Sequence, residues 1–436
     1  MALALPGDIR RIIAAAATGG MILPAAAALA QEAGLQTLTA GAKPPPRLVF
    51  TLKTGVNADT NRSLSLIGKD PATTLDTNIA LAYSARTRVQ SFDAALGALL
   101  RYGHTGNAAA NGSTAVGNGM QEPVAKLAYG FDNGASSVTL RGYYRKAQVN
   151  LSEPLTLSDG TLSPTDLIAT TGSVVSWGAS AGLETGKRRA VGFLARLSAD
   201  RRNYSNNTNS GVYSSSTDAG SLGLRFHIDP VTRFDAIFGY STQRYEDPAH
   251  THLNTRQLTL DYGRMLPDGS ASFSLSAAQD NYGPSQSLQF GRSFTLRTVR
   301  LDTQAGLSFR PGNGPSLIGS LGYLMKGEVD SFSASLSRSV APDATNATVN
   351  YTVLSLGYSR QLTPLAGVSF SLSAARASAS TATNRQSFNA AYSYKLTPDW
   401  SLNAGYSFRH LDAPPTGRAT SNSIFVTLGR SFTLLP

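Results

Sequence analysis

The sequence predicts an all-β chain, folded as a single antiparallel up-and-down β-barrel of about 20 strands, within a range of 18–22. Three observations support this fold class. Segments with alternating apolar and polar residues recur from Arg47 to the end of the chain. The connections between them alternate between short and long. No segment of helical period stands out after Ala30.

The N-terminal segment has the pattern of a signal peptide. Arg10 and Arg11 precede an apolar, alanine-rich stretch (12–23), and Ala28-Leu29-Ala30 is a small-x-small cleavage motif. A buried N-terminal helix is the alternative. No later stretch reaches the ~20 apolar residues of a spanning helix. We therefore predict three regions: a signal peptide (1–30), a short periplasmic N-terminal extension (31–46) and the barrel (47–436).

The composition excludes several classes of protein. The chain has no cysteine, which excludes disulfides, thiolate metal sites and cysteine nucleophiles. Charged residues make up 15%, against roughly 25% in soluble domains. The net charge of +11 would suggest nucleic acid as a partner for a cytosolic protein. In an exported barrel, arginines in the lumen and at the lipid interfaces explain it better.

Each predicted strand has one apolar and one polar face. Over 402–409, for example, Leu, Ala, Tyr and Phe alternate with Asn, Gly, Ser and Arg. The pattern predicts strands starting near residues 47, 76, 91, 122, 136, 173, 188, 218, 231, 252, 269, 286, 298, 315, 329, 348, 365, 384, 399 and 421.

The connections predict which end of the barrel is which. Tight turns such as Asp132-Asn133-Gly134 and Thr397-Pro398-Asp399 alternate with long polar segments such as 57–75 and 149–171. A transmembrane barrel has short periplasmic turns and longer external loops. A first strand rising from Arg47 makes the long connections external, and an even strand number returns the chain to the periplasm.

A repeated motif near the periplasmic strand ends predicts an interface girdle. Leu260-x-Tyr262-x-Arg264 recurs as Leu356-x-Tyr358-x-Arg360. By parity the arginine lies on the apolar face, where it can extend towards the lipid headgroups. The alternative is a β-bulge that turns it inward. The predicted girdle consists of Tyr262, Arg264, Tyr358, Arg360, Tyr392, Tyr394 and Arg430.

The chain resembles the outer-membrane β-barrel proteins of Gram-negative bacteria. The resemblance rests on the signal peptide, the alternating strands, the loop asymmetry and the C-terminal pattern Thr427–Leu434. Segments 356–364, 394–402 and 421–432 look like an uncharacterised barrel family with no assigned activity. The resemblance implies an outer-membrane location after export, with lipid, lipopolysaccharide and the barrel-assembly machinery as partners. The implied assembly signal is Thr427, Gly429, Phe432 and Leu434.

The terminus departs from the family pattern, because barrels usually end on an aromatic residue and this chain ends Leu-Leu-Pro. No nucleic-acid partner is implied, and no apolar patch indicates an oligomeric state.

Polar parity predicts the charged lining of the lumen. The basic residues are Lys53, Arg86, Arg101, Lys126, Arg141, Arg145, Arg196, Arg225, Arg300 and Arg409. The acidic residues are Asp93, Asp200, Asp235, Asp261, Asp280 and Asp302. A basic excess on a pore wall favours anions. Equally, these charges could form paired lattices that brace the barrel without selecting a solute.

The sequence offers little for catalysis. The histidines are His104, His227, His250, His252 and His410. His250-x-His252 could share a strand face as a metal site, but no third ligand has a fixed spacing, so a solvated loop is the better interpretation. No base–nucleophile pairing can be set from spacing, so we predict a non-enzymatic protein without metal or cofactor.

Barrel width suggests the function. Barrels of roughly 16–18 strands leave an aqueous channel, and plugged transporters have about 22. Residues 31–46 are too short for a plug, which favours a porin-like passive channel for small solutes with a modest anion preference. Segments 104–121 and 149–171 are the expected constrictions. The alternative is a non-channel surface or envelope-assembly barrel whose external loops bind a partner.

Overall fold

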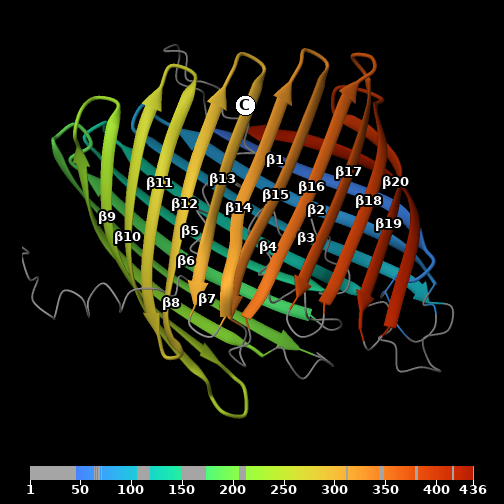
Figure 1. Cartoon of the computed structure of the whole chain (residues 1–436). Helices are drawn as coiled ribbons and strands as arrows, with labels where there is room; N and C mark the ends of the chain where they lie inside the picture. Colours follow the sequence, from blue (N-terminus) through green and yellow to red (C-terminus); the bar gives the residue numbers. More distant parts are fainter. Residues whose placement is uncertain are drawn as a thin grey trace, which may run out of the picture.

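The chain folds into a closed barrel of twenty antiparallel strands (Figure 1). This computed structural model describes residues 46–62, 64, 66, 69, 71–105, 118–148, 173–205, 213–310, 313–342, 348–378, 382–414 and 417–435. The predicted signal peptide, all of the 31–46 extension except its last residue, and the 149–171 segment lie outside these residues. Among the described residues, no helix is long and apolar enough to cross a membrane.

The strands follow one another around the barrel in chain order. The first ten are β1 (Arg47–Asp59), β2 (Ala72–Arg86), β3 (Gln90–Thr105), β4 (Gly119–Asp132), β5 (Ser136–Gln148), β6 (Ser173–Thr185), β7 (Val191–Ser205), β8 (Ser215–His227), β9 (Thr232–Tyr245) and β10 (His252–Leu266). The remaining ten are β11 (Gly269–Asp280), β12 (Gly283–Thr295), β13 (Val299–Arg310), β14 (Asn313–Lys326), β15 (Asp330–Pro342), β16 (Thr348–Gln361), β17 (Ala366–Ser378), β18 (Ala382–Lys395), β19 (Trp400–Ala413) and β20 (Gly417–Leu435).

The all-β barrel prediction is confirmed. Each strand pairs antiparallel with the next, and β20 pairs with β1, so the sheet has no free edge. The strand starts also agree. The largest differences are at β2, predicted near 76 and observed at Ala72, and at β20, predicted near 421 and observed at Gly417.

The two rims differ as the connections predict. One rim, at the top of Figure 1, carries short turns such as 267–268 and 133–135. In the latter, Gly134 adopts φ +79°, and the Asn133 side chain accepts hydrogen bonds from the Ser136 and Ala135 amides at 2.8 and 3.0 Å. In another turn, Asp229 accepts the Val231 amide at 2.8 Å, and this bond lowers the pKa of Asp229. The strand ends that the longer connections join, such as Asp59 with Ala72 and Gln148 with Ser173, lie at the other rim.

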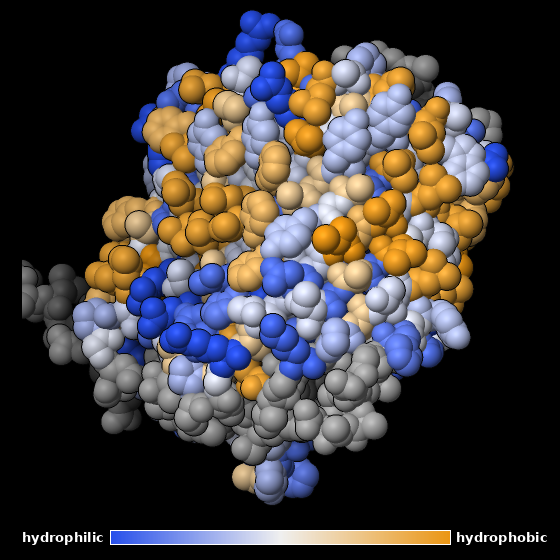
Figure 2. Space-filling view, turned by 90° about the vertical axis from the view of Figure 1, so that its right-hand side faces the viewer, coloured by the Kyte–Doolittle hydropathy of each residue, from blue (hydrophilic) through white to orange (hydrophobic). Residues whose placement is uncertain are grey.

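The apolar side chains point outward, and the barrel has no large apolar core. Val56, Val426 and Leu428 meet across the β1–β20 seam, each 40% or more exposed. Figure 2 shows this apolar surface as a band with hydrophilic residues on either side. Such a band, on a sheet whose backbone groups all pair around the circumference, suits a lipid environment.

The closing seam requires close backbone approach. Gly55 on β1 pairs with Thr427 on β20. A Cβ at Gly55 would collide with the Val426 carbonyl oxygen and come within 2.8 Å of the Thr427 Cα. By contrast, a Cβ at Gly97 on β3 would make ordinary contacts at 3.5 Å or more.

We therefore predict that Gly55→Ala destabilises the barrel by about 1–3 kcal/mol, because the seam cannot accommodate the methyl group without a backbone shift. Gly97→Ala, also on the inward face, is the matched control and should change little. The temperature at which the purified protein loses its folded, faster-migrating form on a gel measures both variants. Equal losses would contradict the tight seam.

Candidate functional site

The register places every charged residue that we predicted for the lumen on one face of the sheet. Arg101 on β3 pairs with Asp76 on β2, and Arg225 on β8 pairs with Asp235 on β9. These residues alternate with the exposed apolar residues of the same strands, and the same parity holds for the other members of the set. The face opposite the apolar band is therefore a polar inner wall.

Several inward charges are paired. Arg225 hydrogen-bonds Asp235 through Nε at 2.8 Å and also contacts Glu184 on β6. Arg310 lies 3.0 Å from Asp280. Two further ion pairs are more exposed to solvent. Arg300 lies 2.7 Å from Asp302, and Arg86 lies 3.7 Å from Asp93. Part of the inner wall is thus the bracing lattice that the sequence left as an alternative.

Four of the cations predicted for the lumen have no ion-pair partner among the described residues. Lys53, Lys126, Arg141 and Arg196 make no ion pair or hydrogen bond with any other described residue. Lys126 pairs in register with Tyr143, two residues along β5 from Arg141. Arg196 pairs with Gly182, two residues along β6 from Ser180, the partner of Arg141. Lys126, Arg141 and Arg196 therefore form a basic staircase across β4–β7.

Another part of the inner wall carries hydroxyl groups instead of charges. No charged residue lies on the inward face of β15, β16 or β17 within the described ranges. The inward serines on these strands are Ser331, Ser333, Ser335, Ser337, Ser339, Ser355, Ser359, Ser369, Ser371 and Ser373. Ser331 and Ser359 lie 2.8 Å apart, as do Ser373 and Ser387 on β18. The lumen therefore has a charged sector and a neutral hydroxyl sector.

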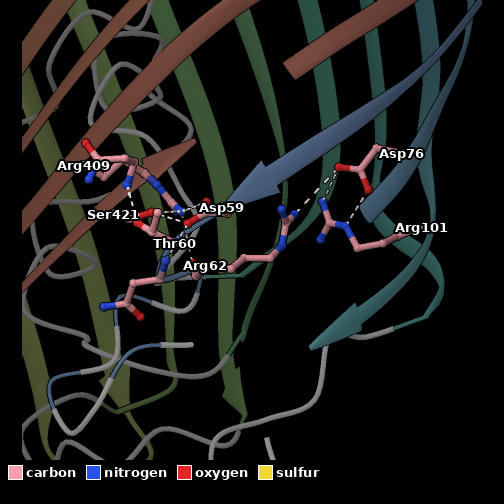
Figure 3. Close-up of polar contacts among 9 residues, drawn as sticks. Asp59, Thr60, Arg62, Asp76, Arg101, Arg409 and Ser421 are labelled. Carbon is pink, nitrogen blue, oxygen red and sulfur yellow. Dashed lines mark hydrogen bonds and ion pairs between the residues drawn. The ribbon is translucent and has the colours of Figure 1, made fainter. Parts of the chain in front are cut away.

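A buried ion cluster joins the first strand of the barrel to its last two strands at the external rim (Figure 3). Arg409 on β19 donates to Asp59 at 2.6 Å and to the Ser421 hydroxyl at 3.3 Å. Ser421 on β20 also donates to Asp59. The Asp59 and Arg409 side chains are 2% and 11% exposed. The backbone continues the join, because the Thr60 amide donates to the Asn422 carbonyl at 2.9 Å.

The first long connection extends this cluster over the inner wall. Arg62 lies 3.8 Å from Asp76, which Arg101 grips through two hydrogen bonds of 2.8 and 3.1 Å (Figure 3). Burial, reinforced by the neighbouring Arg101 charge, lowers the pKa of Arg62 to about 10, so Arg62 stays charged at neutral pH. The carbonyl of Arg62 accepts a bond of 3.1 Å from Arg409.

Leu64 anchors the same connection. It is 6% exposed and packs with Leu411, Ala413 and Ala419, and Leu66 packs against this group. The sequence identified neither this anchor nor Asp59, Asp76 and Arg62. Strand parity could have placed Asp59 and Asp76 inward, but the inward packing of Arg62 and Leu64 carried no sequence signal. We had expected constriction by 104–121 and 149–171, most of which lies outside the described residues.

The predicted girdle residues lie on the outward face. Arg430 pairs with Leu52 and Trp400 without a register shift at that position. Its guanidinium lies over the rings of Phe432 and Trp400, 4.3 and 5.2 Å from their centroids. Arg264 pairs with Ala271, and Arg360 pairs with Val368. Their role at a lipid interface remains a prediction, as does the recognition of Thr427, Gly429, Phe432 and Leu434 during assembly.

His227 lies far from His250 and His252, so these histidines do not form one site. The His227 Nδ1 lies 2.8 Å from the Arg189 carbonyl oxygen at the turn rim, while His250 and His252 lie at the opposite rim. Within the described part of the chain, no group of three or more His, Asp or Glu side chains is placed to hold a metal ion.

The ion cluster predicts a stability effect. Arg409→Met should destabilise the barrel by about 3–5 kcal/mol, because Asp59 would remain buried without its counter-ion. Arg300→Met, which breaks the exposed pair with Asp302, should cost less than about 1 kcal/mol. Denaturant unfolding in detergent measures both. If Arg409→Met lowers the free energy of unfolding by less than Arg300→Met does, the cluster does not hold the seam.

Comparison with known proteins finds solved structures whose fold is similar to that of this chain. No protein-family model matches the sequence, and no curated protein matches it. The siderophore receptor PirA of Pseudomonas aeruginosa matches with 12% identity and a TM-score of 0.48, over 90% of this chain and 81% of that one. OccAB4 of Acinetobacter baumannii matches with 11% identity and a TM-score of 0.39, over 90% and 100%.

OpdL of Pseudomonas aeruginosa matches with 10% identity and a TM-score of 0.36, over 89% of this chain and 99% of that one. Similarity this low gives no information on solute or partner. The closed strand order and the outward apolar band carry the conclusion themselves: the chain is a closed, twenty-stranded antiparallel β-barrel whose outer wall suits a membrane.

Proposed function

We propose that the protein is a porin-like channel of the outer membrane that passes small solutes with a preference for anions. The uncompensated inward cations carry this proposal. Lys126, Arg141 and Arg196 form the basic staircase, Lys53 adds a further charge, and none has a described carboxylate partner. Charges on a low-dielectric wall focus the potential and raise the local concentration of the opposite ion.

The outward arginines support the membrane placement. On β10, Arg256 and Arg264 point outward with Leu258, Leu260 and Tyr262 between them. Eight residues span roughly 27 Å along a strand, or roughly 20 Å along the membrane normal at a tilt of about 40°. This distance is close to the apolar band of about 25 Å in outer-membrane barrels.

The described residues of the first long connection (60–62, 64, 66 and 69) support a narrowed lumen. Leu64 and Arg62 are buried against the inner wall, so the connection occupies space that an empty barrel would leave open. Its Arg62 guanidinium keeps its charge at neutral pH, so the buried cluster of Arg62, Arg101 and Arg409 with Asp59 and Asp76 carries one net positive charge. The proposal therefore places a positive constriction at the external end, above the basic staircase.

Ion selectivity tests the proposal. In planar bilayers under a salt gradient, the wild type should conduct and show a reversal potential of the anion-selective sign. Lys126→Gln, Arg141→Gln and Arg196→Gln together should shift that potential towards zero, because they remove the inward excess. Arg244→Gln, Arg338→Gln and Arg376→Gln remove the same charge from the outward face and should leave it unchanged. Absence of conductance in the wild type would refute the channel.

The proposed constriction leads to a second prediction, which concerns single-channel conductance. Leu64→Ser with Leu66→Ser removes the apolar anchor of the first long connection and should raise single-channel conductance. Val89→Ser with Leu365→Ser, exposed apolar residues at the turn rim, is the control and should not change it. Unchanged conductance in the Leu64 and Leu66 variant would show that the connection does not limit flow.

A further inference from the structure

A groove crosses the outward wall of β5–β9. Its volume is about 600 Å³. The floor is made of small residues, Ala179 and Ala181 on β6, Ala199 on β7 and Gly220 on β8. Leu140, Leu197 and Tyr240 rise beside them, each 43% or more exposed. The register puts these side chains on the outward face, so the groove opens towards the surrounding membrane.

A polar row closes the external side of this groove. One register row runs across six strands and points outward: Tyr144, Trp177, Arg201, Ser216, Arg244 and His252. The row lies two residues beyond Ala179 and Ala199 on β6 and β7. Arg256, the β10 partner of Tyr240, stands at the far end of the groove. Aromatic rings and cations thus border an apolar recess on one side.

The arginines in this region differ in whether they have an ion-pair partner. Asp218 pairs with Arg201 at 2.9 Å, and the Arg201 guanidinium lies 6.0 Å from the Trp177 ring centre. This pair fixes Arg201 but leaves no net charge. Arg244 and Arg256 are exposed and have no ion-pair partner among the described residues. Arg244 lies in the row, and Arg256 lies four residues along β10 from His252, the partner of Arg244. Two anionic groups roughly 13 Å apart would each meet one free guanidinium group, which suits phosphate.

We propose that this groove binds lipopolysaccharide, with the two phosphates of its lipid A on Arg244 and Arg256 and an acyl chain along the alanine floor. This inference rests on the proposed membrane placement, which makes the Arg244 row the outer-leaflet side. An amphiphile with an anionic head and apolar chains matches both parts of the site. A second copy of the chain fits less well, because a symmetric contact would bring two sets of arginines together.

The opposite wall provides a natural control. Arg338, Thr352 and Arg376 form an outward row on β15–β17 that parallels Arg201, Ser216 and Arg244. The neighbouring row there contains Leu336, Leu354 and Ala374, so two of its three residues are leucines. Both rows present arginines to the outer leaflet, and only the first borders the groove. Removal of two arginines from each side therefore separates a specific site from general attraction.

Native mass spectrometry of the purified barrel, titrated with diphosphoryl lipid A, tests the site. The wild type should bind one lipid A in preference to others. Arg244→Ala with Arg256→Ala should weaken that binding by at least about tenfold, the effect of losing charge-assisted contacts. Arg338→Ala with Arg376→Ala should change it less than about twofold. Equal losses from both pairs, or none from either, would overturn the proposal.

A second pair of variants leaves the charge unchanged. Ala181→Leu with Ala199→Leu fills the groove and should weaken lipid A binding, whereas Ala334→Leu with Ala374→Leu on the opposite wall should not. Both pairs face lipid, so folding should survive, and gel mobility checks this. A lipid-free oligomer in the same spectra, lost on filling the groove, would assign the site to a second copy and refute lipid A. The readout is independent of conductance, so a closed lumen would refute the channel and leave this test intact.

Discussion

Pairing of the first and last strands is the interaction on which the rest of the structure depends. The β1–β20 ladder joins residues nearly four hundred positions apart and removes the only sheet edges in the barrel. Without it, two rows of backbone donors and acceptors would face an apolar solvent, which is prohibitively costly. Closure also fixes side-chain parity around the whole circumference, so every strand keeps its apolar residues outward and its polar residues inward.

The ion cluster at the external rim reinforces that closure from inside. It takes Asp59 from β1 and Arg409 and Ser421 from β19 and β20, next to the seam they hold. Two residues of the first long connection lie against the same region, Arg62 through its carbonyl and Leu64 through its packing. The seam and the described part of this connection therefore belong to one structure, since the groups that stabilise the closure also hold Arg62 and Leu64 against the inner wall.

Much of the fold was predictable because it follows from local rules. Alternation with period two gave the strand starts to within a few residues, and turn chemistry at Asn133-Gly134 separated the two rims. Face assignment followed from parity alone, so the inward position of residues such as Arg101 and Arg225 needed no knowledge of their neighbours. These features depend on the sequence within a single strand or turn.

Contacts between strands could not be predicted in the same way. The Asp59–Arg409 pair and the row from Trp177 through Arg201 to Arg244 depend on the register of several strands at once, and one residue of slip would abolish them. The alanine floor of the groove looks unremarkable in each strand separately. The inward packing of Leu64 depends on barrel curvature and closure, which no short segment encodes.

Disulfide cross-linking at the seam tests the account most directly, and the chain has no native cysteine to interfere. Thr54 pairs with Leu428 across β1 and β20, whereas Ile424 pairs with Ala58. Thr54→Cys with Leu428→Cys should form an intramolecular disulfide in the folded protein, and Thr54→Cys with Ile424→Cys should not. Absence of the first cross-link, or its formation only between chains, would contradict a barrel closed by its first and last strands.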